Sequence, residues 1–249
     1  MVRQVIAGNW KMNKTIAEAV AFAAGLRAAL SAPPDREVII APPFTALQAV
    51  AEAIRGSFIQ LAAQNLHEAE KGAYTGEISA GMLREAGCTG VIVGHSERRT
   101  LFGEGDALIN RKLRAALTAG LKPIFCIGES LREREEDETE IVIERQLKEG
   151  LNNLTGDDIA TCVIAYEPVW AIGTGKTASP AQAEAVHRFI RTWVAGRYGQ
   201  ERAAATPILY GGSVTPKDIV DLMAQPDING ALVGGASLDV DSFARIIGY

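Results

Sequence analysis

The chain has 249 residues, with 25 basic and 30 acidic side chains and 47% hydrophobic residues. This balance is typical of a folded globular protein and excludes disorder, collagen and coiled coil as descriptions of the whole chain. The net charge of −5 disfavours a protein that mainly binds a nucleic-acid backbone, because such binding needs a dominant positive field. Small anionic ligands stay open through a local site.

The N-terminal segment 1–13 lacks the apolar region of a signal peptide, and no run approaches the ~20 apolar residues of a membrane span. Cys88, Cys126 and Cys162 are odd in number and stand in apolar stretches. That pattern favours buried free thiols in a reducing compartment over a disulfide or metal framework. We therefore expect a cytoplasmic protein.

Short β-branched runs recur along the chain, with helical patterns between them. Each run is continuously apolar, as in parallel strands that are buried on both faces. The expected strands cover residues 4–7, 37–41, 58–63, 90–93, 123–127, 161–166, 207–210 and 230–233. No linker or composition break divides them. Eight strand–helix units in one chain of this length predict a single-domain (β/α)8 barrel that spans residues 1–249.

The helices between these strands are indicated by caps and by apolar spacing. Ser179-Pro180-Ala181-Gln182 combines a capping hydroxyl, a first-turn proline and a capping-box glutamine, and predicts a helix over 180–198. Thr215-Pro216 predicts another helix start, and the charged run 131–140 predicts a solvated helix start or loop. After the cap Thr15, an apolar face is predicted to comprise Ile16, Val20, Ala23, Leu26 and Leu30.

Barrel enzymes place their active sites in the loops that follow the strands. Polar or glycine-rich segments follow five of the predicted strands here, at 8–11, 94–98, 167, 211–213 and 234–237. The beginnings of the strands carry little of note. This asymmetry predicts an enzyme site on one rim of the barrel.

The last two of these segments indicate phosphate binding. Gly211-Gly212-Ser213 and Gly234-Gly235 follow neighbouring strands, and glycine lets backbone N–H groups approach an anion closely. Either pair alone could be a simple turn. Two pairs in adjacent loops favour an anion site.

Glu167 and His95 are the candidate acid–base residues. Glu167 ends a strand beside the apolar segment 169–172, and desolvation there would raise its pKa and make it a stronger base. His95 precedes a short helix, whose N-terminus disfavours the imidazolium and would favour a neutral hydrogen-bond donor. The alternatives are a salt-bridged rim glutamate and a structural histidine. His67 and His187 are expected to be structural, and the scattered histidines predict no metal site.

The chain closely resembles the triosephosphate isomerase family. The segments that carry the resemblance span nearly the whole chain, and the longest of them, around Glu167, is highly specific. They are GNWKMN (8–13), AAQN (62–65), GAYTGE (72–77), GHSERR (94–99), CIGE (126–129), AYEPVWAIGTGKTA (165–178), YGGSV (210–214) and VGGASL (233–238).

The resemblance implies interconversion of dihydroxyacetone phosphate and D-glyceraldehyde 3-phosphate, without cofactor or metal. It implies that Glu167 moves the proton, that His95 polarises the carbonyl, and that Lys11 offsets negative charge with help from Asn9. The phosphate would be held by Gly173, Ser213, Gly234 and Gly235. Glu97 matches a family acid whose role stays open.

The resemblance also implies a mobile lid and a homodimer. In the dimer, Thr75 in the loop 65–78 would approach the partner's site. The lid would exclude water over Glu167. Its residues would be Pro168, Val169, Trp170, Ala171, Ile172, Gly173, Thr174, Gly175, Lys176, Thr177 and Ala178.

Two alternatives differ in class from an isomerase. Another phosphate-binding barrel enzyme, such as a Schiff-base aldolase, would need a desolvated lysine deep in the barrel, whereas Lys11 follows the first strand at the rim. A non-catalytic barrel that serves as a scaffold is disfavoured by the presence of Lys11, His95 and Glu167 together.

Overall fold

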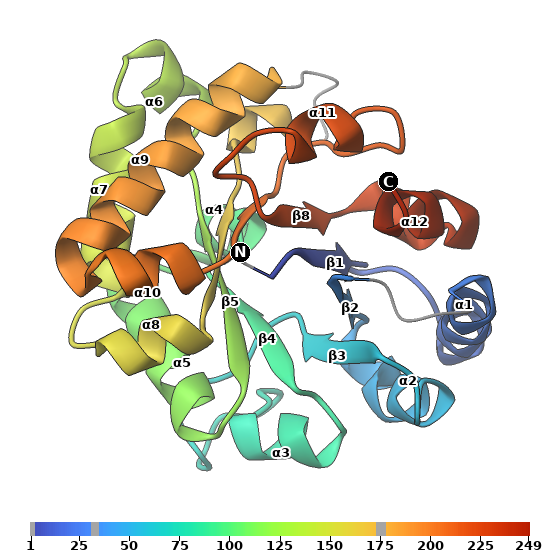
Figure 1. Ribbon diagram of the computed structural model, residues 1–249. Helices are drawn as coiled ribbons and strands as arrows, with labels where there is room; N and C mark the ends of the chain where they lie inside the picture. The colour runs from blue at the N-terminus through green and yellow to red at the C-terminus, as the bar shows by residue number, and fades with distance from the viewer. Residues whose placement is uncertain (1–2, 31–34, 173–177) are drawn as a thin grey trace.

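The computed structural model describes residues 3–30, 35–172 and 178–249, and its strands form a closed parallel barrel (Figure 1). Neighbours in the chain are neighbours in the barrel, and β1 closes it by pairing with β8. The predicted fold is therefore confirmed. The strands are β1 (Val5–Asn9), β2 (Glu37–Ala41), β3 (Ile59–Ala63), β4 (Gly90–Val93), β5 (Lys122–Ile127), β6 (Val163–Tyr166), β7 (Ile208–Tyr210) and β8 (Gly230–Val233).

Helices surround the barrel, and the last one, α12, lies beside α1 (Figure 1). The α-helices are α1 (Ile16–Ala29), α2 (Leu47–Ala53), α3 (Ala80–Glu85), α4 (Ser96–Phe102), α5 (Asp106–Thr118), α6 (Leu131–Glu135), α7 (Thr139–Gly150), α8 (Gly156–Thr161), α9 (Pro180–Tyr198), α10 (Gln200–Ala205), α11 (Ile219–Met223) and α12 (Val240–Ile247). Short 3-10 turns are η1 (Phe44–Ala46), η2 (Val169–Ala171) and η3 (Gly235–Leu238).

Two helix starts confirm the capping signals in the sequence. Helix α9 begins at Pro180, and Ser179 and Gln182 form the predicted capping box. Helix α1 follows Thr15, but Ile16, which was predicted to belong to its apolar face, is 51% exposed. The buried stripe of α1 runs instead through Ala19, Phe22, Ala23 and Leu26, a spacing that leaves Ile16 at its margin.

Several strand boundaries and one helix start differ from the prediction, and two of these differences have a clear local cause. Helix α11 begins at Ile219 rather than at Pro216, because a turn precedes it in which the Asp218 N–H donates to the Thr215 carbonyl. Strand β6 begins at Val163 rather than at Thr161, because Thr161 is the last residue of α8. The charged run 131–140 forms α6 and the beginning of α7 with largely exposed side chains, as predicted.

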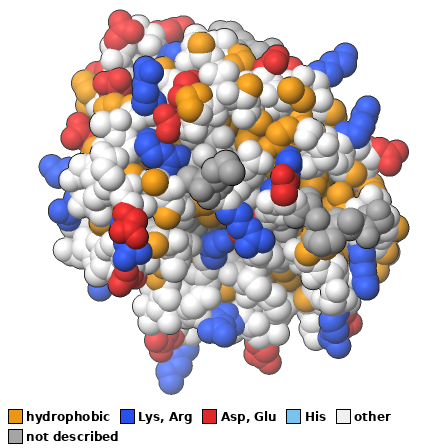
Figure 2. Space-filling model, in the orientation of Figure 1, with side chains coloured by type: hydrophobic (Ala, Val, Ile, Leu, Met, Phe, Trp, Pro, Cys, Tyr) orange, Lys and Arg blue, Asp and Glu red, His pale blue; other side chains and the backbone are white. Residues whose placement is uncertain are grey.

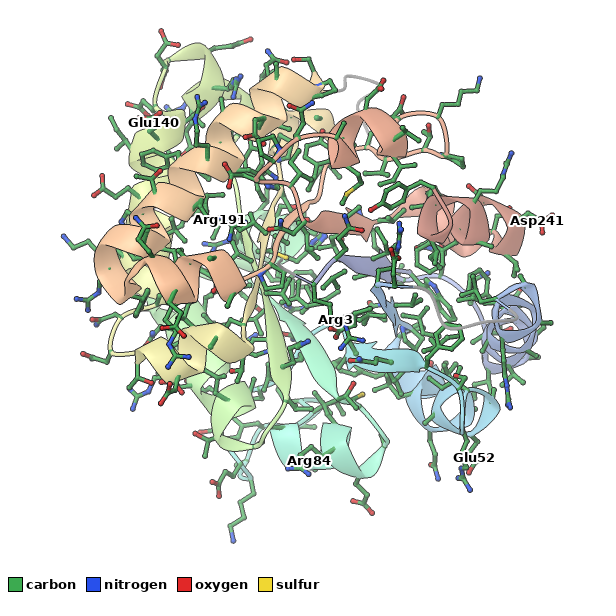
Figure 3. All side chains as sticks on the ribbon, in the orientation of Figure 1. Arg3, Glu52, Arg84, Glu140, Arg191 and Asp241 are labelled. Atoms are coloured by element: carbon green, nitrogen blue, oxygen red, sulfur yellow. The ribbon has the colours of Figure 1, made fainter. Side chains whose placement is uncertain are left out.

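The buried apolar side chains form two layers. One layer lies between strands and helices, where the sticks in Figure 3 crowd together, while Glu52, Glu140 and Asp241 project outward from α2, α7 and α12. The other layer consists of strand residues alone and fills the barrel, so that the barrel is a packed core rather than a pore. Its members are Val5, Ala7, Ile39, Ala41, Ala62, Ile92, Ile124, Cys126, Val163, Ala165, Leu209 and Leu232.

Charged side chains of both signs are interspersed on the face of the molecule seen in Figure 2. Every helix in the described part of the chain is too short or too polar to span a lipid bilayer. Cys88, Cys126 and Cys162 are buried and form no disulfide, which confirms the prediction of buried free thiols.

Candidate active site

The loops after the strands enclose a cavity of about 320 Å³. Its walls bring together every described residue that was predicted to bind or convert a substrate, while Gly173 lies outside the described residues. Those lining residues are Asn9, Lys11, His95, Glu167, Ser213, Gly234 and Gly235. A larger hollow of about 560 Å³ lies over α3 and α5, but none of the predicted site residues lines it.

Glu167 lies directly after β6 and is only 2% exposed. One carboxylate oxygen, Oε1, lies 2.9 Å from His95 Nε2, and the other, Oε2, accepts a hydrogen bond from the Ser96 N–H at 2.9 Å. Burial raises the pKa of Glu167, but His95, the Ser96 N–H and Lys11 lower it, and the net shift is downward. The expectation of a raised pKa is therefore wrong for this arrangement, because charged and polar neighbours outweigh the apolar ones.

His95 is the N-cap of α4, and its side chain has a defined orientation. Nδ1 accepts a hydrogen bond from the Glu97 N–H at 3.2 Å, so the neutral ring carries its proton on Nε2, the atom that faces Glu167. Burial lowers the pKa of His95, whereas the Glu167 and Glu97 carboxylates raise it, with a net upward shift. His95 and Glu167 thus share one short polar contact at the edge of the cavity.

Lys11 reaches the cavity from a constrained backbone. Its φ is +53°, a left-handed value that is uncommon for a residue with a side chain. The Lys11 N–H donates to Asn9 Oδ1 at 3.0 Å, and Gln64 Nε2 donates to the Lys11 carbonyl at 2.9 Å. The Lys11 ammonium lies 2.7 Å from Glu97 Oε1. Asn9 and Gln64 therefore orient Lys11, and Glu97 pairs with its charge.

Two glycines allow the backbone to pack closely around Glu167. A Cβ added at Gly128 would lie 1.7 Å from the Glu167 carbonyl oxygen, and one at Gly211 would lie 2.8 Å from Glu167 Cγ. The Gly211 N–H also donates to the Tyr166 carbonyl at 2.7 Å. Gly128 therefore leaves room for the Glu167 backbone, and Gly211 leaves room for its side chain.

A second part of the cavity lining is suited to an anion. Gly234 and Gly235 expose backbone there, and a Cβ at Gly235 would meet nothing within 4 Å. A Cβ at Gly234 would lie 3.6 Å from Lys11 Cε, so the lysine side chain runs beside this glycine. Backbone N–H groups next to an ammonium favour a phosphate. In the described part of the chain, no group of three His, Cys, Asp or Glu residues could hold a metal ion.

The predicted lid is described over Pro168–Ile172 and at Ala178; Gly173, Thr174, Gly175, Lys176 and Thr177 lie outside the described residues. Its first part is tied to Glu129, which follows β5. Glu129 Oε1 accepts hydrogen bonds from Trp170 Nε1 at 2.9 Å and from the Tyr166 hydroxyl at 3.0 Å. Burial raises the pKa of Glu129, and these donors partly oppose that rise.

Sequence reasoning gave no role to Glu129 or to Gln64. Both stand in quoted motifs directly after a strand, and that position was the signal that could have singled them out.

His67 and His187 are structural, as predicted. His67 packs against Tyr74 at 4.1 Å between ring centroids and accepts a hydrogen bond from the Ala69 N–H. His187 is fully buried and lies against the ring of Tyr166 at 5.8 Å, and burial lowers its pKa to about 3.

Comparison with known proteins identifies the family. A model of the family "Triosephosphate isomerase" matches residues 4–249. Proteins named triosephosphate isomerase from Endomicrobium trichonymphae and Chloroflexus aurantiacus are 53% and 55% identical to the chain, the first over all of the chain and 99% of the relative, the second over 98% of each. One from Herpetosiphon aurantiacus is 53% identical over the full length of both. With its cavity residues in place and full-length relatives at this identity, the chain belongs to the triosephosphate isomerase family.

Proposed function

We propose that this protein interconverts dihydroxyacetone phosphate and D-glyceraldehyde 3-phosphate by proton transfer through an enediolate, as an enzyme of glycolysis and gluconeogenesis. The observation that carries the proposal is the 2.9 Å contact between His95 Nε2 and Glu167 Oε1 in a cavity that Lys11, Gly234 and Gly235 also line. His95 and Glu167 supply a hydrogen-bond donor and a base, and Lys11, Gly234 and Gly235 supply positive charge and N–H groups for a phosphate. Family membership supports the same reaction.

Glu167 is the proposed base. Its carboxylate removes a proton from C1 of dihydroxyacetone phosphate, the C–H electron pair forms the C1–C2 double bond, and the carbonyl oxygen takes up the negative charge. His95 Nε2–H donates to that oxygen, where charge develops. After the hydroxyl proton has moved between the two oxygens, Glu167 returns its proton to C2 and the aldehyde is formed.

Glu167 must change partners before it acts. In the described arrangement its two oxygens are engaged by His95 and by the Ser96 N–H, so neither faces a substrate carbon. Substrate that enters the cavity competes for the His95 donor, and release of Ser96 frees the second oxygen. These contacts lower the pKa of Glu167. Their loss leaves desolvation as the main influence, which raises the basicity of the carboxylate.

Lys11 is proposed to offset the charges of the phosphate and of the enediolate oxygen, and Asn9 to hold the Lys11 backbone and the substrate oxygens. The phosphate would lie against Ser213 and the backbone of Gly234 and Gly235, with Gly173 added from the lid. Closure of residues 168–178 over the cavity would exclude water and protect the enediolate from loss of phosphate.

The proposed assembly is a homodimer of single-domain chains, residues 1–249, in the cytoplasm. Thr75 lies in an exposed loop, which supports its proposed approach to a partner's site. Tyr74, next to Thr75 in the chain, is 49% exposed, and Met12 and Met82 are 95% and 54% exposed. Burial of such side chains favours association.

A Schiff-base aldolase is less well supported. Lys11 stands at the rim and pairs with Glu97, while Lys112, which is buried, donates to Glu104 and Asn65 away from the cavity. A scaffold without catalysis would not need the buried His95–Glu167 contact.

A coupled assay for D-glyceraldehyde 3-phosphate, run with and without EDTA, tests the proposal. We expect rapid turnover both with and without EDTA. When the reaction is run in D2O, we expect deuterium at C2 of the product, because the transferred proton passes through a carboxyl group that exchanges with solvent. No turnover, loss of turnover with EDTA, or product free of solvent deuterium at early times would each contradict the proposed mechanism.

A further inference from the structure

Lys14 stands three residues after Lys11 in the loop between β1 and α1, and its side chain folds back onto the protein. Its ammonium Nζ lies 4.8 Å from the ring centroid of Phe22 and 5.6 Å from that of Trp10. The same Nζ donates a hydrogen bond to the Leu238 carbonyl at 2.8 Å. Residues 14 and 238 are far apart in the sequence, so this side chain joins two loops.

The backbone of Lys14 has an unfavourable conformation that these contacts offset. Its φ of +74° lies in the left-handed region, which glycine adopts with less strain than lysine. The contacts of the side chain offset that strain, because a cation over two aromatic faces and a charge-assisted hydrogen bond are both favourable.

The side chain of Lys14 contacts two segments of the chain, and each segment contains residues that line the cavity. Trp10 is fully buried and lies between Asn9 and Lys11 in the chain. Leu238 is the last residue of η3, whose first residue is Gly235, and the Ser237 hydroxyl within this turn donates to the Gly234 carbonyl at 2.7 Å. Lys14 thus donates to the carbonyl of Leu238, at the end of the turn that begins at Gly235.

We propose that Lys14 is a positioning residue for phosphate binding: it holds the loop of Lys11 against the loop of Gly234 and Gly235, and so sets the distance between the ammonium and the backbone N–H groups. Lys11 Cε lies 3.6 Å from the position of a Cβ built at Gly234, and Lys14 maintains this spacing between the two loops. The inference rests on the proposed function, because it assigns the phosphate to these two loops.

Three variants of the full-length protein test this role. Lys14→Met keeps the length and apolar stem but removes the charge and the donor, Lys14→Arg keeps both, and Lys14→Gly removes the side chain while favouring the left-handed backbone. Lys148→Met on the exposed face of α7 is the matched control. For each protein, the Kd of inorganic phosphate is measured by calorimetry, kcat and KM by the coupled assay, and Tm by thermal unfolding.

We expect Lys14→Met and Lys14→Gly to raise the phosphate Kd and the KM by about tenfold, with a much smaller change in kcat. Lys14→Arg should restore both constants to near the wild-type values, and Lys148→Met should change neither. If Lys14→Met fails to fold, Lys14→Gly serves in its place.

The inference is overturned if the Met and Gly variants bind phosphate like the wild type and only their Tm falls. It is overturned too if Lys14→Arg binds phosphate as weakly as Lys14→Met, or if the wild type does not bind phosphate. A wild type that binds phosphate but does not isomerise the triose phosphates refutes the proposed function alone, and the phosphate Kd still decides the role of Lys14.

Discussion

His95 Nε2 and Glu167 Oε1 lie 2.9 Å apart, although the two residues are far apart along the chain. The N–H of Ser96, next to His95, donates to the other oxygen of Glu167. The side chains of His95 and Glu167 are more than nine-tenths buried, with 6% and 2% of their residue surface exposed. Each group changes the charge state of the other: the carboxylate raises the pKa of the imidazole, and the imidazole lowers that of the carboxylate. The proposed base and the proposed donor therefore titrate as a pair.

Glu167→Gln should abolish most of the activity while keeping the fold. The amide has nearly the same shape but accepts no proton from carbon, so kcat should fall by about a thousandfold or more. The coupled assay measures this loss. Glu144→Gln, an exposed glutamate of α7, is the matched control and should retain full activity. Equal turnover in the wild type and in Glu167→Gln would refute the role of Glu167 as the base.

His95→Gln should move the acid limb of the pH profile. Burial raises the pKa of Glu167, and His95 is the first of the groups that oppose this rise. Without His95 the pKa of Glu167 increases, so the carboxylate is protonated at a higher pH and activity is lost earlier on acidification. The acid limb of kcat/KM should shift upward in pH, and kcat should fall by about a hundredfold. An acid limb that stays in place or moves downward would show that His95 does not stabilise the carboxylate.

Much of the fold was predictable from local pattern. The apolar runs predicted all eight strands, because most side chains of a strand that is buried on both faces are apolar. The capping box predicted the first residue of α9 correctly. The start of α11 was predicted wrongly from Thr215-Pro216. A proline after a capping threonine also fits the turn that precedes the helix, which begins at Ile219. Local sequence did not distinguish the two.

The candidate site was predictable only as a set of residues. Motifs after the strands named Lys11, His95 and Glu167, but the direction of the pKa shift of Glu167 depends on which groups surround it in space. The apolar sequence neighbours suggested a rise, whereas His95 and Ser96, distant in the chain, produce a fall. The Lys14–Leu238 contact likewise joins segments that no local pattern connects.

His187 should make stability sensitive to acid. Burial lowers the pKa of His187 from 6.5 to about 3, so the unfolded chain binds a proton that the folded chain does not between these values. The stabilising contribution is complete above the unfolded pKa and is lost as the pH falls, by about 2 kcal/mol at pH 5. In urea unfolding, the stability difference between the wild type and His187→Asn should shrink by that amount between pH 7 and pH 5. A difference that is independent of pH would contradict a buried neutral His187.

Gly211→Ala should impair catalysis through the position of Glu167. The added Cβ would lie 2.8 Å from Glu167 Cγ and 3.1 Å from the Tyr166 carbonyl oxygen, so the carboxylate side chain has to shift. Displacement of a base by a fraction of an ångström to about 1 Å lowers kcat by about tenfold to a hundredfold. Gly196→Ala within α9, where an added Cβ meets nothing within 4 Å, is the control and should keep full activity. Unchanged kcat in Gly211→Ala would mean that Glu167 tolerates the shift.

Thr75→Arg tests the proposed dimer. Thr75 is exposed in the single chain, so an arginine there should leave the fold of one chain intact but introduce bulk and charge where the partner's site is proposed to lie. Sedimentation of the wild type should give about twice the 26.5 kDa of one chain, and the variant should shift toward one chain at low concentration. Because Thr75 is proposed to approach the partner's Asn9 and Lys11, kcat should fall together with the mass. Thr192→Arg, on the exposed face of α9, should change neither quantity. A wild type that sediments as one chain would refute the dimer, and a variant that stays dimeric and fully active would place Thr75 outside the interface.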